Sequence, residues 1–214
     1  MKTGSSRPFR RPALIVVALF TALALVALAG CADSSPVAAP TSTLPEQPGD
    51  GAAADPAEVD IPEYETELDL TAAEEEAVDG ALEAFVGYIA TINRVFSSGG
   101  KDTSKANIFA RDGSLESINS EAEEMRASNT YMAGEYNAYD VRVESVSIDE
   151  ATPERSKVSV LFCTKDSEWQ VVPAGEALPS SEPRGLTMQY EITFADAEWK
   201  VANQHLRSKQ CGSV

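Results

Sequence analysis

Residues 186–206 read LTMQYEITFADAEWKVANQHL, and they contain the clearest strand pattern of the chain. Apolar side chains at every second position from Leu186 to Phe194 alternate with polar ones, which is typical of a strand with one buried and one solvated face. The stretch 194–198 is short enough for a hairpin turn, and 198–206 continue as a second strand. The sequence therefore predicts a pair of antiparallel strands near its C-terminal end.

Two earlier segments carry the same strand signals, namely period-two alternation and many β-branched or aromatic residues. They are residues 139–148 and 157–164, and the turn sequence ATPE at 151–154 joins them. A longer connection follows, with a short additional strand expected at 169–172. This part of the chain is predicted to form an antiparallel sheet of about four to five strands.

A long helix is predicted ahead of the strands. Thr71 and Glu74 have the spacing of a capping box, and Gly99 and Gly100 would end the helix. One narrow apolar stripe, which we expect to pack on the sheet, contains Val78, Leu82, Phe85, Ile89, Ile92 and Phe96. The opposite side carries Glu76, Gly80, Glu83, Gly87 and Arg94.

Residues 101–133 predict two shorter helices, separated near Asp112 and Gly113. The apolar face of the second helix contains Leu115, Ile118, Ala122 and Met125. Its acidic residues are Glu116, Glu121, Glu123 and Glu124. No DxDxDG-like loop accompanies these glutamates, so we interpret them as a solvated face and not as a calcium site.

Helices followed by strands indicate an α+β domain and not alternating βαβ units. The helices, the strands ending in EWKV and the terminal cysteine resemble the cone-shaped nuclear-transport-factor-2-like (cystatin-like) fold. VSVLFCTKDS at 158–167 and EWKVANQHLRSKQC at 198–211 are similar to a family of secreted actinobacterial lipoproteins. The resemblance implies that residues 67–214 form a cone, with the N-terminal helices packed on the concave face of a curved antiparallel sheet.

The first thirty residues have the pattern of an export signal. Four basic residues precede an uncharged run at 13–30, and the run ends in Leu28-Ala29-Gly30-Cys31, which resembles the bacterial lipobox. We expect residues 1–30 to be a cleaved lipoprotein signal peptide and Cys31 to be acylated. The acyl chains would hold the protein on the outer face of the cell membrane of a bacterium, which the resemblance identifies as an actinobacterium. The alternative is an uncleaved membrane-spanning helix with an incidental cysteine.

Residues 31–66 are rich in Pro, Ala and acidic residues and predict a disordered tether. Removal of residues 1–30, which carry four basic and no acidic side chains, would bring the net charge from −17 to −21. Such an acidic protein repels phosphate backbones, so nucleic-acid binding is not expected. The oligomeric state is left open.

Two cysteines remain after Cys31, namely Cys163 and Cys211. An even pair in a chain routed to an oxidising compartment predicts a disulfide between them. No CxxC motif is present and His205 is the single histidine, so neither a metal site nor a cofactor is expected.

The resemblance raises an enzyme hypothesis, because the same fold hosts isomerases, dehydratases and lyases. Alternation in the last strand would place Trp199, Val201, Asn203 and His205 on one side. If that side faces the cone, His205 and Asn203 would line it. Asp140, or a tyrosine such as Tyr136, Tyr139 or Tyr190, could then orient the imidazole for general-base catalysis.

Two binding hypotheses compete with catalysis. A cone mouth that accepts a small apolar molecule or a peptide would be lined by Trp169, Met188, Tyr190 and Trp199. The interpretation ranked first is a non-catalytic module of the cell envelope that binds a protein or another envelope component. A filled cone would favour this surface recognition.

Overall fold

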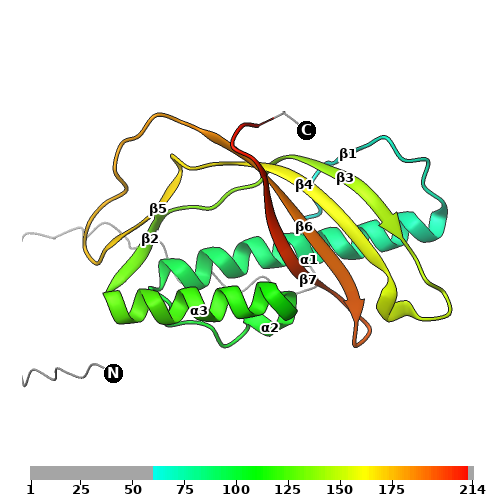
Figure 1. Ribbon diagram of the computed structural model, residues 1–214, viewed down its shortest axis with the longest axis horizontal. Coiled ribbons are helices and arrows are strands. Elements are labelled where there is room, and N and C mark those ends of the chain that lie inside the picture. The colour runs from blue at the N-terminus through cyan, green and yellow to red at the C-terminus, as the bar shows by residue number, and fades with distance from the viewer. Residues whose placement is uncertain (1–59, 212–214) are drawn as a thin grey trace, which may run out of the picture. The chain divides into compact units, whose positions relative to one another are not determined.

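The computed structural model describes residues 60–211, which form an α+β domain (Figure 1). Its helices are α1 (Ala72–Ser97), α2 (Ala106–Phe109) and α3 (Asp112–Ser128). Its strands are β1 (Glu65–Thr66), β2 (Thr130–Gly134), β3 (Tyr139–Ser147), β4 (Lys157–Lys165), β5 (Trp169–Pro173), β6 (Gly185–Ala195) and β7 (Glu198–Ser208). A 3-10 turn at Pro153–Arg155 lies between β3 and β4. The predicted signal peptide and Cys31 lie outside the described residues.

The larger sheet has the strand order β1-β3-β4-β6-β7, and β2 pairs with β5 in a separate two-stranded sheet. All five predicted strands are present. The pairs β3–β4, β4–β6 and β6–β7 are antiparallel, whereas β1 runs parallel to β3. The sheet is therefore mixed and not purely antiparallel as expected. β1 falls inside the range predicted to be a disordered tether, so regular structure begins before residue 67.

Helix α1 runs across one face of the larger sheet and contacts β3, β4, β6 and β7 (Figure 1). The predicted capping box is present: the Thr71 side chain accepts a hydrogen bond from the Glu74 backbone, and the Glu74 carboxylate accepts one from the Thr71 backbone N–H. That bond lowers the pKa of Glu74. Among residues 60–211, no helix is both long and apolar enough to cross a bilayer.

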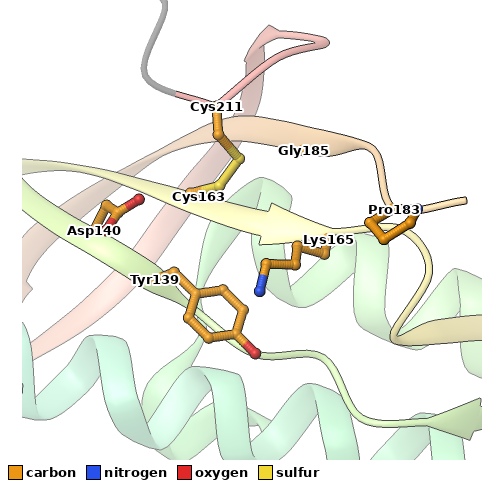
Figure 2. Close-up of a pocket in the computed structure, with 7 residues that line it drawn as sticks. All are labelled: Tyr139, Asp140, Cys163, Lys165, Pro183, Gly185 and Cys211. Atoms are coloured by element: carbon orange, nitrogen blue, oxygen red, sulfur yellow. A yellow bond between two sulfur atoms is a disulfide. The ribbon is translucent and has the colours of Figure 1, made fainter.

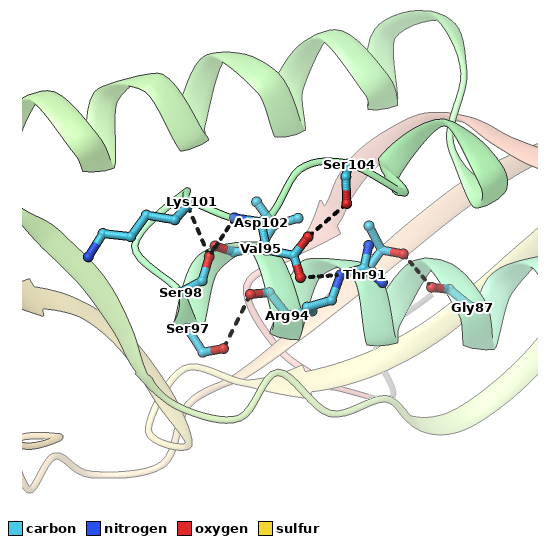
Figure 3. Close-up of polar contacts among 9 residues, drawn as sticks. All are labelled: Gly87, Thr91, Arg94, Val95, Ser97, Ser98, Lys101, Asp102 and Ser104. Atoms are coloured by element: carbon cyan, nitrogen blue, oxygen red, sulfur yellow. Dashed lines mark hydrogen bonds and ion pairs between the residues drawn. The ribbon is translucent and has the colours of Figure 1, made fainter. Parts of the chain in front are cut away.

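The C-terminal end of α1 is fixed by Ser98, whose hydrogen bonds Figure 3 shows, and by two glycines. The Ser98 hydroxyl donates to the Val95 carbonyl over 2.7 Å and accepts the Lys101 and Asp102 backbone N–H groups, each over 3.0 Å. Gly99 and Gly100 have φ values of 66° and 75°, which glycine adopts without strain. The chain therefore leaves α1 where the sequence predicted.

The buried surface of α1 is wider than the predicted stripe. Tyr88 and Val95, outside the stripe, are completely buried. Gly87, predicted to lie on the opposite side, is buried as well, because the Phe109 ring of α2 packs directly on it and would collide with any Cβ there. The prediction that Gly87 lies away from the core is wrong, since α2 covers that side of α1.

Helices α2 and α3 lie beside β7, the edge strand of the sheet (Figure 1). The Arg111 backbone N–H donates to the Val201 carbonyl over 3.0 Å, and Lys200 Nζ donates to the Asn107 carbonyl over 3.2 Å. The chain between α2 and α3 is therefore bonded to this edge at Val201, which protects that position from pairing with another chain.

Candidate functional site

The space between α1 and the sheet is filled by aromatic side chains. Phe162 and Tyr190, from β4 and β6, meet edge to face with ring centroids 4.7 Å apart. Phe85 and Tyr88 come from α1 and lie 5.0 Å from Phe162 and 5.3 Å from Tyr190, respectively. All four rings are at most 1% exposed. The space between α1 and the larger sheet is therefore packed with protein.

The four residues predicted to line a cone mouth do not gather around one opening. Tyr190 is completely buried, and Met188 is paired with Phe162 across the neighbouring strands. Trp169, in β5, packs on Tyr136 with ring centroids 5.3 Å apart. The fourth residue, Trp199, packs on Phe194 and Gly80 elsewhere in the core.

Three tyrosine hydroxyls lie within this core. Tyr136 and Tyr190 share a hydrogen bond of 3.3 Å between their hydroxyls. Burial raises the pKa of Tyr136 to about 12 and raises the pKa values of Tyr88 and Tyr190 above the usual value for a phenol. Ser114, next to Tyr88, partly opposes the rise at that residue. Since all three phenols stay protonated near neutral pH, they offer no base for proton abstraction.

Alkaline pH is expected to destabilise the protein through these tyrosines. In the unfolded chain a tyrosine ionises near about pH 10, whereas the folded protein keeps the three buried phenols protonated to higher pH. Their stabilising contribution is thus complete below about pH 10 and is lost as the pH rises through the folded-state values, with a slope of at most about 1.4 kcal/mol per pH unit for each tyrosine. Urea unfolding from pH 8 to pH 12 measures it. Tyr88→Phe should reduce the slope, and a free energy of unfolding that is constant over this range would contradict the prediction.

His205 and Asn203 do not face the core between α1 and the larger sheet. In β7, Val201 pairs with Ile192 and Asn203 pairs with Glu191, so Ala202 is an extra residue at a β-bulge. A bulge shifts the alternation of side chains. His205 is therefore paired with Gln189 on the outer face of the sheet and is exposed. The prediction that His205 and Asn203 share a face with Trp199 and Val201 is wrong, because simple alternation does not include the bulge.

Asp140 is not placed to orient the His205 imidazole. It lies in β3, and strands β4 and β6 separate β3 from β7. The Asn203 amide instead donates to the Glu191 carboxylate over 3.2 Å. The three candidate catalytic residues are thus not brought together.

A row of hydrogen-bonded polar side chains crosses the same outer face. The Gln189 side-chain amide donates to Glu144 over 2.7 Å and to Ser159 over 2.6 Å, and Arg207 donates to Gln189 Oε1 over 2.6 Å. In the part of the chain that the structure describes, no group of three or more His, Cys, Asp or Glu residues could hold a metal ion.

The predicted disulfide joins Cys163 to Cys211, across 48 positions of sequence. Next to it lies a hollow of about 350 Å³, here called the disulfide pocket (Figure 2). The pocket is lined by Tyr139, Asp140, Cys163, Lys165, Pro183, Gly185 and Cys211. The sequence analysis named the two cysteines, Asp140 and Tyr139 for other roles and did not select this set as one site. The sequence signal that could have indicated this site is the position of these residues at the ends of β3, β4 and β6, next to a predicted disulfide.

One side of the disulfide pocket is held by a compact set of polar contacts. Lys165 Nζ lies 4.1 Å from the centroid of the Tyr139 ring and 3.3 Å from Glu168 Oε1. The Tyr139 hydroxyl donates to Glu168 Oε2 over 2.6 Å, which lowers the pKa of Glu168 and raises that of Tyr139. The charge of Lys165 is therefore already compensated.

A second hollow, of about 440 Å³, lies where α1 and α3 end. Lys101 and Arg126 line it, and Arg126 donates to the Gly100 carbonyl. Cations at helix C-termini compensate the negative ends of the helix dipoles. The two basic residues here are thus accounted for by the fold.

No protein-family model and no curated protein matches the chain. Among solved structures, the intermembrane space region of the chloroplast protein ARC6 is similar, with 13% sequence identity and a TM-score of 0.46. The match covers 61% of this chain and 94% of the ARC6 chain. This likeness carries no argument about what the present chain binds.

Proposed function

We propose that this chain is a lipid-anchored extracytoplasmic protein whose nuclear-transport-factor-2-like domain binds an envelope partner through its surface and does not catalyse a reaction. The observation that supports this most is the packing of Phe85, Phe162 and Tyr190 between α1 and the sheet. An enzyme or a carrier of this type would need that space for its ligand.

The location rests on two separate features. The Cys163–Cys211 disulfide agrees with an oxidising compartment outside the cytoplasm. The basic leader and the Leu28-Ala29-Gly30-Cys31 sequence support acylation of Cys31. Two acyl chains on one cysteine would provide the stable attachment that a single chain does not.

The anchor is tested by intact mass and by metabolic labelling with a clickable fatty acid in an actinobacterial host. We expect the mature protein to begin at Cys31, to carry a diacylglyceryl mass and to sediment with membranes. Cys31→Ala should lose the label, whereas Cys163→Ser/Cys211→Ser, which also removes cysteines, should keep it. A protein that retains residues 1–30 and carries no acyl mass would contradict the assignment.

Titration of the same purified protein with a fluorescent fatty acid tests the filled interior. We expect no saturable one-to-one binding, because Tyr190 and its neighbours occupy the space. Saturable binding that Tyr190→Trp abolishes would show that the interior opens. It would favour a ligand carrier over a surface-binding module.

A further inference from the structure

The disulfide pocket is built from chain segments that are distant in the sequence but joined by covalent and backbone constraints. Tyr139 is the cross-strand partner of Cys163, and Lys165 is the partner of Gly185. The disulfide adds Cys211, which follows β7. Gly185 lies so close to Cys211 Sγ that any side chain there would collide with the sulfur. Strand pairing and the disulfide therefore hold most of the pocket lining together.

The walls of this pocket are mainly apolar. They consist of the disulfide sulfurs, the Pro183 ring, the Tyr139 ring and the alkyl part of Lys165 (Figure 2). Its volume of about 350 Å³ lies at the small end of the range for ligand pockets. Such a space accommodates one long side chain more readily than a large cofactor.

The charged groups of the pocket are not equivalent. Lys165 is paired with Glu168, as described above, and outside the lining Arg184 is paired with Asp166 over 2.7 Å. Asp140 is exposed, and no hydrogen bond or ion pair joins its carboxylate to another part of residues 60–211. The uncompensated charge of the pocket is thus negative.

The backbone of Asp140 is also unusual. Its φ of 50° lies in the left-handed region, at a register shift between Tyr139 and Arg142. Aspartate tolerates this conformation better than most residues do. The carboxylate is turned toward the disulfide (Figure 2), at the apolar wall of the pocket.

We propose that the disulfide pocket binds a lysine or arginine side chain of a partner protein. The alkyl stem of that side chain would lie along the disulfide, Pro183 and Tyr139, and its cationic end would meet the Asp140 carboxylate. The net charge, which falls from −17 to −21 when the four basic residues of 1–30 are removed, favours the approach of a basic partner. This inference rests on the proposed surface-binding function and names the chemistry of the partner.

NMR titration of the ¹⁵N-labelled full chain in detergent micelles tests the proposal. The probes are acetyl-Ala-Lys-Ala-amide and its norleucine counterpart, which keeps the stem and lacks the charge. We expect the lysine peptide to shift the amide signals of Tyr139, Lys165 and Gly185 and the norleucine peptide to bind at least roughly twofold more weakly. Equal binding of the two peptides, or shifts outside the pocket only, would overturn it.

Asp140→Asn is the matching variant, because asparagine also tolerates the left-handed conformation. It should weaken the lysine peptide roughly two- to fivefold, the range expected for an exposed ion pair. Asp196→Asn is the control, since Asp196 is exposed and has a φ of 53° but lies in the β6–β7 turn. Equal effects of the two variants would overturn the assignment to Asp140.

Butylammonium provides the last arm of the test. We expect the lysine peptide to bind more tightly than this small amine, because a protein partner also contacts the rim of the pocket. Equal affinities would indicate a site for free amines and overturn a protein partner. Absence of binding by any of these probes would overturn the proposed lysine or arginine site. It would leave acylation of Cys31 and the filled interior unaffected, so the failure of this site and the failure of the proposed function are distinguishable.

Discussion

Phe85→Ala is expected to lower the free energy of unfolding by about 3 to 5 kcal/mol. Phe85 is 1% exposed, and its ring lies 5.0 Å from Phe162 and 5.8 Å from Tyr190, measured between centroids. Alanine would remove these edge-to-face contacts and leave a cavity that α1 and the sheet cannot close. Small domains have free energies of unfolding of about 5 to 15 kcal/mol, so this single change would remove a large part of the stability.

Urea unfolding followed by far-ultraviolet circular dichroism and tryptophan fluorescence would measure this loss. Leu206→Ala is the control, because Leu206 is 50% exposed and its truncation should change stability by less than about 1 kcal/mol. A loss below about 1 kcal/mol for Phe85→Ala would mean that the interior is not tightly packed. That outcome would also weaken the argument for a surface-binding function.

Removal of the disulfide by Cys163→Ser/Cys211→Ser is expected to cost about 4 kcal/mol, the chain-entropy value for a closed loop of this length. The bond joins the end of β4 to the segment after β7, and the connection spans 48 positions. Breaking it increases the conformational freedom of the unfolded chain far more than that of the sheet. Guanidinium unfolding of the oxidised wild type and of the double variant would measure the difference.

A reducing agent provides the internal control for the disulfide. It should lower the stability of the wild type to that of the double variant and leave the variant unchanged. Equal stability of the oxidised wild type and the variant would show that the bond contributes nothing to folding. An effect of the reductant on the double variant would point to a cause other than this bond.

Local sequence signals were sufficient for most of the fold. The Thr71–Glu74 capping box and the glycines after residue 98 determined the ends of α1, and alternation in 186–194 identified β6. The turn after β6 has positive φ values at Asp196 and Ala197, as a tight hairpin requires. These features depend on neighbours in sequence, which is why they could be predicted.

Features that depend on distant partners were missed. β1 consists of Glu65 and Thr66 alone, and its pairing with β3 is not encoded by any local periodicity. The bulge at Ala202 likewise follows from packing and reversed the orientation predicted for His205. The disulfide pocket could be anticipated only in part, because its lining comes from three strand ends that meet after the sheet has formed.

The parallel strand β1 has a mechanical consequence. It is the first strand of the described domain, it is two residues long, and Thr66 Oγ1 donates to the Val143 carbonyl over 3.0 Å. A pulling force transmitted along the backbone from residue 60 would load these few bonds before it reached α1. At the C-terminal end of the described chain, the Cys163–Cys211 bond ties the segment after β7 to β4. Under such a force β1 would separate from β3 first, while the disulfide kept the C-terminal segment attached to β4.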